Sequence, residues 1–102
     1  MTRLAAIDIG TNSTRLLVAE VAGGRVKVVE TGLCTTRLGE GINEGILHAG
    51  AMERTLAAVA GFAEAAQKLG ARQVVAAATS AVRDAANRAD FLAMVKERAG
   101  LE

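Results

Sequence analysis

The start of the chain places an acidic side chain inside an apolar run and follows it at once with a short polar turn. Asp8 interrupts the apolar residues 4–9, and Gly10-Thr11-Asn12-Ser13 comes directly afterwards. Apolar residues resume at 16–21, so the pattern predicts a strand, a tight turn and a second strand. We expect Gly10 to adopt the positive φ of a sharp reversal, since glycine has no Cβ to oppose it. This hairpin, with a charge beside its turn, constrains every later element of the fold.

The turn itself has the chemistry of an anion site. Backbone N–H groups around Thr11, Asn12 and Ser13 can form a concavity that binds phosphate, and their side chains add donors. The Asp8 carboxylate would repel a phosphate held there, so the arrangement makes sense only with Mg²⁺ between the two, directly or through water. The alternative is an ordinary hairpin that carries a surface aspartate, because such turns are common between strands.

Further along the chain, the apolar spacing changes its period. Residues 25–31 predict a third strand, joined to the second by a hairpin at Gly23-Gly24. Residues 37–45 hold three glycines and predict a loop. A helix follows, because apolar side chains then recur at steps of four and three, and Gly70 would end it. The residues of this apolar stripe are Met52, Leu56, Val59, Ala63 and Ala66.

The last third begins with a strand and ends in helix. Residues 73–79 are almost continuously apolar, which is typical of a strand covered on both faces in a parallel sheet. Residues 80–86 predict a short helix with Thr79 or Ser80 as its N-cap. A second helix is predicted after it, capped by Asn87 or Asp90 and ended by Gly100. Its apolar residues are Phe91, Leu92, Val95 and Ala99.

Composition excludes several classes of function. The 102 residues form one domain, and their net charge of +1 comes from basic side chains that are scattered rather than clustered. With two Phe and no Tyr or Trp, the chain also lacks stacking platforms, so we expect no nucleic-acid partner. The first apolar stretch is too short for a signal peptide or a membrane span, which predicts a cytoplasmic protein with no membrane partner.

Two single residues carry groups that are often reactive. Cys34 is the only cysteine, so no internal disulfide can form, and we interpret it as a packing residue. His48 is the only histidine and precedes the predicted helix. We expect it to be a solvated loop residue rather than a metal ligand or general base.

Three separated motifs carry a family resemblance: residues 8–18, 37–41 and 78–87. In this order they are similar to the N-terminal subdomain of the exopolyphosphatase and guanosine pentaphosphate phosphohydrolase (Ppx/GppA) family, a branch of the actin-like superfamily that includes acetate kinase, sugar kinases and Hsp70. The resemblance implies an α/β fold of the actin-like, ribonuclease-H-like type, with three antiparallel strands followed by a helix and a parallel strand. Residues 1–102 would be the incomplete N-terminal part of the phosphatase domain.

The resemblance also implies an activity. Members are hydrolases that remove terminal phosphate from inorganic polyphosphate, or the 5′ terminal phosphate of guanosine pentaphosphate, with Mg²⁺. Such phosphoryl transfer needs positioning and charge neutralisation more than covalent chemistry. By this resemblance Asp8 holds the metal through its water shell and Arg83 stabilises charge on the phosphoryl group. The residues assigned to substrate binding are Gly10, Thr11, Asn12, Ser13, Thr79 and Ser80, with Arg37 and Glu40 as further candidates.

Several of these assignments have structural alternatives. Arg83 could instead form a salt bridge with Asp84 or Glu40. Arg37 and Glu40 could line the cleft or only fix the glycine-rich loop. We expect Asp84 and Asn87 to cap and orient helices rather than to touch substrate.

The chain departs from the family in one important way. The glutamate that activates the attacking water lies beyond a strand that would begin near Leu101, and Glu102 comes too early to replace it. A second glycine-rich phosphate loop is also missing. We therefore expect a truncated and inactive fragment whose open sheet edge and apolar face favour a homodimer.

Two other classes of function remain open. One is a kinase of the same superfamily, which would need an adenosine pocket outside these residues. The other is a non-catalytic module that binds phosphate or nucleotide, because proteins of one fold often differ in task. The sequence does not distinguish polyphosphate from guanosine pentaphosphate as substrate.

Overall fold

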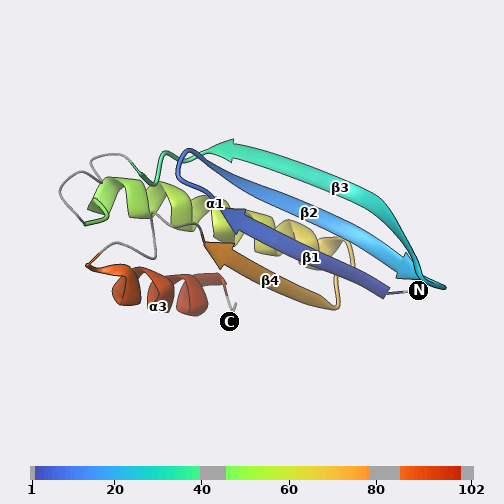
Figure 1. Ribbon diagram of the computed structural model, residues 1–102. Coiled ribbons are helices and arrows are strands. Elements are labelled where there is room, and N and C mark those ends of the chain that lie inside the picture. Colours follow the sequence, from blue (N-terminus) through green and yellow to red (C-terminus); the bar gives the residue numbers. More distant parts are fainter. Residues whose placement is uncertain (1, 40–45, 79–85, 100–102) are drawn as a thin grey trace.

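The fold is a mixed sheet of four strands with helices packed on one side (Figure 1). The computed structural model describes residues 2–39, 46–78 and 86–99. Its elements are β1 (Thr2–Ile9), β2 (Ser13–Ala22), β3 (Arg25–Thr35), α1 (Ala49–Lys68), β4 (Gln73–Ala78) and α3 (Arg88–Ala99). The strand order is β3-β2-β1-β4, with β1 antiparallel to β2 and parallel to β4. The predicted order of elements is therefore confirmed for the described residues.

The core lies between α1 and the sheet. Successive side chains of a strand point to opposite faces, so Ala5, Ile7 and Ile9 of β1 are buried toward the helix while Asp8 is exposed on the other face. The predicted apolar stripe of α1 is confirmed, with Met52 half-buried and the other four residues buried. The helix nevertheless begins at Ala49, one turn earlier than the stripe.

Glycine ends α1 as predicted. Gly70 has a φ of +79°, a left-handed conformation that costs an L side chain energy. Its N–H donates to the carbonyl oxygen of Gln67 at 3.0 Å, and the N–H of Ala71 donates to that of Ala66 at 3.0 Å. This pair of bonds is a Schellman motif, which satisfies carbonyl groups that the helix leaves open.

The start of α1 differs from expectation. His48 is the residue that precedes the helix; it is half-buried, and its Nε2 atom is buried. His48 is thus a loop residue as predicted, but the prediction that it is solvated is wrong. The physical reason is its position, because a residue directly before a packed helix is partly covered by the segments that the helix packs against.

Two burial predictions for the sheet are also wrong. Residues of β4 alternate between exposed and half-buried, and Val75 is 50% exposed, so the strand is covered on one face only. Cys34 is exposed on β3 rather than packed. The face of β4 opposite α1 is open in the described part of the chain, which exposes Val75. Cys34 pairs with Thr14 and so lies on the same face as α1, but α1 lies mainly over β1 and β2 and does not cover this end of β3.

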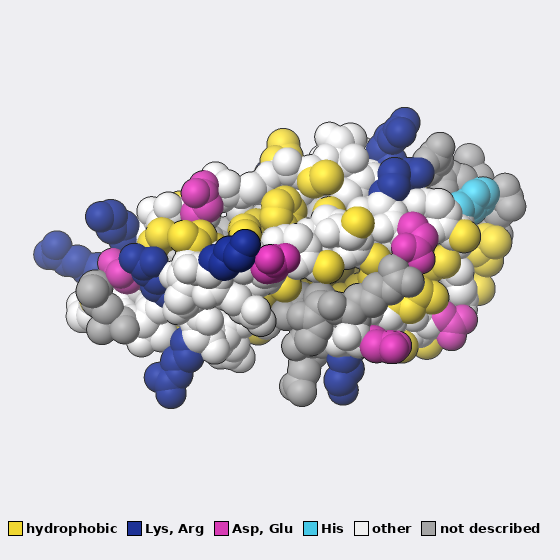
Figure 2. Space-filling view, turned by 180° about the vertical axis from the view of Figure 1, so that it is seen from behind, with side chains coloured by type: hydrophobic (Ala, Val, Ile, Leu, Met, Phe, Trp, Pro, Cys, Tyr) yellow, Lys and Arg dark blue, Asp and Glu magenta, His cyan; other side chains and the backbone are white. Residues whose placement is uncertain are grey.

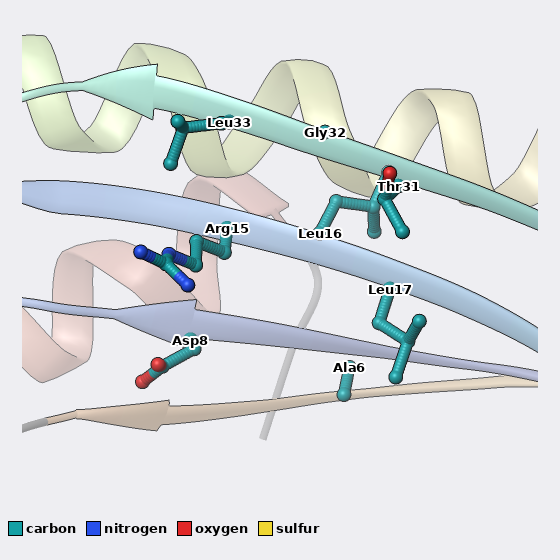
Figure 3. Close-up of a pocket in the computed structure, with 8 residues that line it drawn as sticks. All are labelled: Ala6, Asp8, Arg15, Leu16, Leu17, Thr31, Gly32 and Leu33. Carbon is teal, nitrogen blue, oxygen red and sulfur yellow. The ribbon is translucent and has the colours of Figure 1, made fainter.

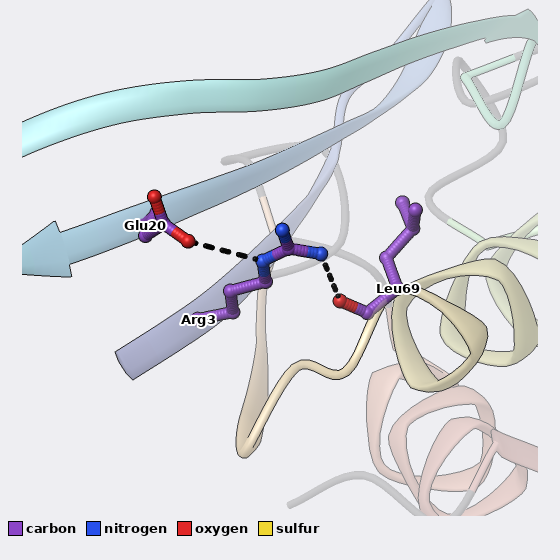
Figure 4. A network of polar contacts seen from close by, with 3 residues as sticks. All are labelled: Arg3, Glu20 and Leu69. Carbon is purple, nitrogen blue, oxygen red and sulfur yellow. Dashed lines mark hydrogen bonds and ion pairs between the residues drawn. The ribbon is translucent and has the colours of Figure 1, made fainter. Parts of the chain in front are cut away.

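Arg3 links the start of β1 to β2 and to the end of α1 (Figure 4). The Arg3 guanidinium donates to the Glu20 carboxylate at 3.4 Å through Nε and to the Leu69 carbonyl oxygen at 2.8 Å through Nη1. The Arg72 N–H donates to the Arg3 carbonyl oxygen at 2.7 Å. These contacts join the start of β1 to the end of α1, which helps to set β4 parallel to β1.

The predicted short helix and its N-cap, Thr79 or Ser80, fall on residues 79–85 and lie outside the described residues, as does Gly100. α3 begins at Arg88, directly after Asn87, as predicted. The Asn87 side chain, however, bonds Leu47: its Oδ1 accepts the Leu47 N–H at 2.8 Å and its Nδ2 donates to the Leu47 carbonyl oxygen at 3.0 Å. Asn87 thus joins the entries of α1 and α3 instead of capping α3 through its side chain.

Surface charges are mixed. Figure 2, turned to the side opposite Figure 1, shows basic and acidic side chains interspersed over that face, without a continuous basic stripe. Within the described ranges, no helix is both long and apolar enough to cross a membrane.

Candidate functional site

The candidate site lies where β1 and β4 end. The two strands are parallel, and Ile9 pairs with Ala78 in their register, so their carboxyl ends meet at one edge of the sheet. Ligands of open α/β sheets bind at this edge. Of the residues predicted for the site, Glu40, Thr79, Ser80 and Arg83 lie outside the described residues, as does Asp84.

The turn between β1 and β2 is tight, but not for the predicted reason. The Gly10 N–H donates to the Ser13 carbonyl oxygen at 2.9 Å. Gly10 does not have a positive φ, so that expectation is wrong. Glycine is required here for space, because a Cβ at this position would lie 2.7 Å from the same Ser13 oxygen.

The turn is docked onto the segment that follows β3. The Thr11 carbonyl oxygen accepts the Gly39 N–H at 2.9 Å. The Asn12 carbonyl oxygen accepts two N–H groups, from Thr36 at 3.1 Å and from Arg37 at 2.9 Å. Gly39 allows this approach, since an added Cβ would overlap the Thr11 side chain.

This docking sets the direction of the turn amides. In a trans peptide the N–H points opposite to the C=O of the preceding residue. Because the Thr11 and Asn12 carbonyls point at residues 36–39, the N–H groups of Asn12 and Ser13 point away from that segment. Amides presented in succession, with their carbonyls engaged elsewhere, are the feature that an anion-binding concavity needs.

A buried polar layer supports the docked segment. The hydroxyl groups of Thr14 and Thr36 are hydrogen-bonded at 3.0 Å, and both residues are almost fully buried. Arg54, on α1, donates from Nε to the Thr36 carbonyl oxygen at 3.1 Å. Sequence reasoning missed this layer, since its members are far apart in the chain and only their contact reveals it.

Arg37 has an unusual backbone. Its φ is +49°, the one positive value among described residues other than glycine. Its N–H holds the turn while its side chain is exposed. Its backbone therefore helps to fix the segment, and the other predicted role, in which the exposed Arg37 side chain lines the cleft, stays a prediction.

Asp8 is accompanied by a second charge. Arg15 pairs with Asp8 across the β1–β2 register, and both side chains are exposed on the open face of the sheet, side by side (Figure 3). Arg15 belongs to the first sequence motif but was given no role there. The signal that could have found it is symmetry, because Asp8 lies two residues before the turn 10–13 and Arg15 two residues after it.

The surroundings of Asp8 limit how a metal could bind. Among the residues that the structure describes, no group of three or more Asp, Glu, His or Cys side chains could hold a metal ion. Mg²⁺ commonly takes one or two carboxylates and completes its shell with water and substrate phosphate oxygens. The exposed Asp8 carboxylate fits that mode of binding.

A groove extends from this pair along the open face of the sheet (Figure 3). Apart from Asp8 and Arg15 at one end, it is lined largely by apolar residues, including Ala6, Leu17 and Leu33. The charged chemistry is thus confined to the end of the groove near the turn.

Comparisons with known proteins agree on one family. A family model described as the Ppx/GppA phosphatase family matches residues 17–102. Exopolyphosphatase 2 of Mycobacterium tuberculosis is 41% identical over 105 residues, which is 98% of this chain and 33% of that protein. Exopolyphosphatase 1 of Mycobacterium bovis is 33% identical over 102 residues, 98% of this chain and 30% of that protein.

Solved structures show the same fold. The Ppx/GppA phosphatase of Aquifex aeolicus superimposes with a TM-score of 0.93 at 31% identity, over 99% of this chain and 34% of that one. An exopolyphosphatase from Cytophaga hutchinsonii superimposes with a TM-score of 0.94 at 27% identity, over 99% of this chain and 33% of that one. The predicted actin-like α/β fold is confirmed by these matches. The chain spans about a third of the length of the relatives that it matches.

Proposed function

Because the chain belongs to the Ppx/GppA phosphatase family, we propose that it contributes the turn and metal-binding carboxylate of an enzyme that releases terminal phosphate from inorganic polyphosphate. Guanosine pentaphosphate is the second candidate substrate, since the family name includes its phosphohydrolases. The mycobacterial relatives are named exopolyphosphatases, which favours polyphosphate. The activity is proposed for the full-length protein that carries this chain, and the 102 residues alone are expected to be inactive.

One observation carries the proposal: the turn beside Asp8 is docked by its carbonyl oxygens. The Thr11 and Asn12 carbonyls accept three N–H groups from residues 36–39, so the negative ends of these peptides are kept from a bound anion. An ordinary surface hairpin has no need of such docking. The arrangement supports a phosphate site at the turn.

The neighbouring charges suit phosphoryl transfer. Asp8 would hold Mg²⁺ through its water shell, and the metal would neutralise the oxygens of the terminal phosphate. Arg15, across the register from Asp8, and Arg37, next to the docked turn, would offer guanidinium groups to phosphate oxygens. Thr79, Ser80 and Arg83 keep the roles that the family resemblance implies, with Glu40 as a further candidate.

The cellular setting is proposed on the same basis. We place the reaction in the cytoplasm, with no nucleic-acid or membrane partner. A homodimer would cover part of the open sheet face, on which Leu4, Leu17 and Val75 are between 38% and 50% exposed.

The test is phosphate release from polyphosphate and from guanosine pentaphosphate, with Mg²⁺, by the full-length protein. We expect Asp8→Asn to lower kcat/KM by about 100-fold or more, as loss of one preorganised charge-stabilising group does in other enzymes. Arg72→Gln is the control, because this arginine is exposed at the start of β4, at the opposite end of the strand from the site. Wild-type protein that releases no phosphate from either compound, or an Asp8→Asn variant that matches wild type, would overturn the proposal. If the wild type releases no phosphate from either compound but transfers phosphate from ATP, the result would point to a kinase.

A further inference from the structure

One side chain on α1 reaches the phosphate turn through a single peptide group. The Thr36 carbonyl oxygen accepts the Arg54 Nε–H at 3.1 Å, and the N–H of the same peptide, which belongs to Arg37, donates to the Asn12 carbonyl oxygen at 2.9 Å. The peptide between Thr36 and Arg37 is thus held at both ends. Hydrogen bonds in such a chain polarise and strengthen one another.

We propose that Arg54 is a positioning residue that orients the Thr36–Arg37 peptide and, through it, the phosphate-binding turn. If this peptide rotated, the Thr36 carbonyl would face the Asn12 carbonyl, and the turn would lose a donor and meet a repelling oxygen. The bond from Arg54 opposes that rotation. The inference rests on the proposed function, since positioning has meaning only if the turn binds phosphate.

The backbone of Arg37 supports the same conclusion. A φ of +49° at a residue other than glycine is unfavourable and persists only where surrounding contacts hold it. The Thr36–Arg37 peptide is the unit whose orientation sets this angle. The bonds to Arg54 and Asn12 hold that peptide from its two sides.

Arg54 acts from the opposite side of the sheet from the charged pair. α1 packs on the face where Ile7 and Ile9 are buried, whereas Asp8 and Arg15 are exposed on the other face. Its Nε is engaged by the Thr36 carbonyl. We therefore propose that its effect on the site passes through the bond to Thr36, because it lies on the other side of the sheet from Asp8 and Arg15.

The chain of atoms in the side chain gives a sharp test. In Arg the Nε is the fourth atom counted from Cβ, and in Gln the amide nitrogen occupies the same place. Arg54→Gln thus keeps a donor there and removes the charge, while Arg54→Met keeps the length and removes both. We expect Arg54→Met to lower kcat/KM for phosphate release by the full-length protein on the order of 10-fold, as small misplacements of binding groups do.

Arg54→Gln should restore most of this loss, and Arg72→Gln should resemble wild type. Thermal unfolding is measured for every variant, and Arg54→Glu, which has oxygen in place of the donor, replaces Arg54→Met if the latter does not fold. Equal kcat/KM for wild type and Arg54→Met, with an active wild type, overturns the inference alone. Equal losses in Arg54→Gln and Arg54→Met also overturn it, because the charge would then be what matters. A wild type that releases no phosphate overturns the proposed function together with the inference.

Discussion

The buried hydroxyl pair beneath the turn should show strong energetic coupling. Thr14 and Thr36 are 0% and 1% exposed, and their hydroxyl oxygens lie 3.0 Å apart. Thr36→Val keeps the shape of the side chain but leaves the Thr14 hydroxyl without this bond, which costs about 1–3 kcal/mol for a buried group. We expect the free energy of unfolding to fall by about 2 kcal/mol, which corresponds to a fall in Tm of roughly 8–16 °C for a chain of this size.

The double variant decides whether the cost comes from the pair. Replacing both threonines by valine removes both polar groups, so the double variant should be less destabilised than either single variant. Urea unfolding of the four proteins gives the coupling free energy, and Thr31→Val is the control, because its side chain is exposed on β3. Additive losses in the double variant would refute this account of the layer.

Three further variants test other parts of the structure. Arg37→Gly should relieve the positive φ and raise stability by up to about 1 kcal/mol in urea unfolding, while it lowers kcat/KM for phosphate release; unchanged stability would mean that the backbone is not strained there. Asn87→Ala should lower stability by about 2–3 kcal/mol in the same assay, because it removes two hydrogen bonds to Leu47, whereas Asp90→Ala, on the exposed first turn of α3, should change it by less than about 1 kcal/mol. Gly70→Ala should lower stability by about 1–2 kcal/mol through the left-handed conformation at the end of α1. The control is Gly61→Ala, which lies inside the helix with open space around it and should raise stability by about 0.5–1 kcal/mol; a Gly70→Ala variant that is also no less stable than wild type would contradict this reason.

Most of the fold could be predicted because local pattern and tertiary structure agree. The short apolar runs predicted β1 and β2, and the recurrence of apolar residues every three or four positions predicted α1. Gly70 predicted the end of this helix. A helix between two strands also implied the parallel pairing of β1 and β4. The predictions that fail concern burial, which depends on the elements that pack over each strand. The sequence does not show that α1 covers only one face of the sheet, so the open side of β4 was missed. It also does not show that α1 lies over β1 and β2 rather than β3, so the exposed thiol of Cys34 was missed.

The residues of the proposed site stay a prediction, and their geometry could not be obtained from the sequence. Asp8 and the turn stand next to each other in the sequence, and their chemistry is evident from residue types alone. Glycine is needed at position 10 for a different reason than the one predicted. It is not needed for a positive φ but because the Ser13 carbonyl oxygen occupies the space that a Cβ would take. Arg15 was missed because its pairing with Asp8 becomes evident only when residues are counted outward from both ends of the turn.

The direction of the turn amides is the property that least depends on the turn's own sequence. A peptide group can present either its N–H or its C=O to a ligand, and the residues Thr11, Asn12 and Ser13 are compatible with both. The choice is made by Thr36, Arg37 and Gly39, whose N–H groups donate to the turn carbonyls, and the Thr36–Arg37 peptide is itself held from α1 by Arg54. The proposed phosphate site therefore depends on contacts from the segment that follows β3 and from α1. It follows that substitutions outside the turn, at Thr36, Gly39 or Arg54, should alter phosphate binding as surely as substitutions within it.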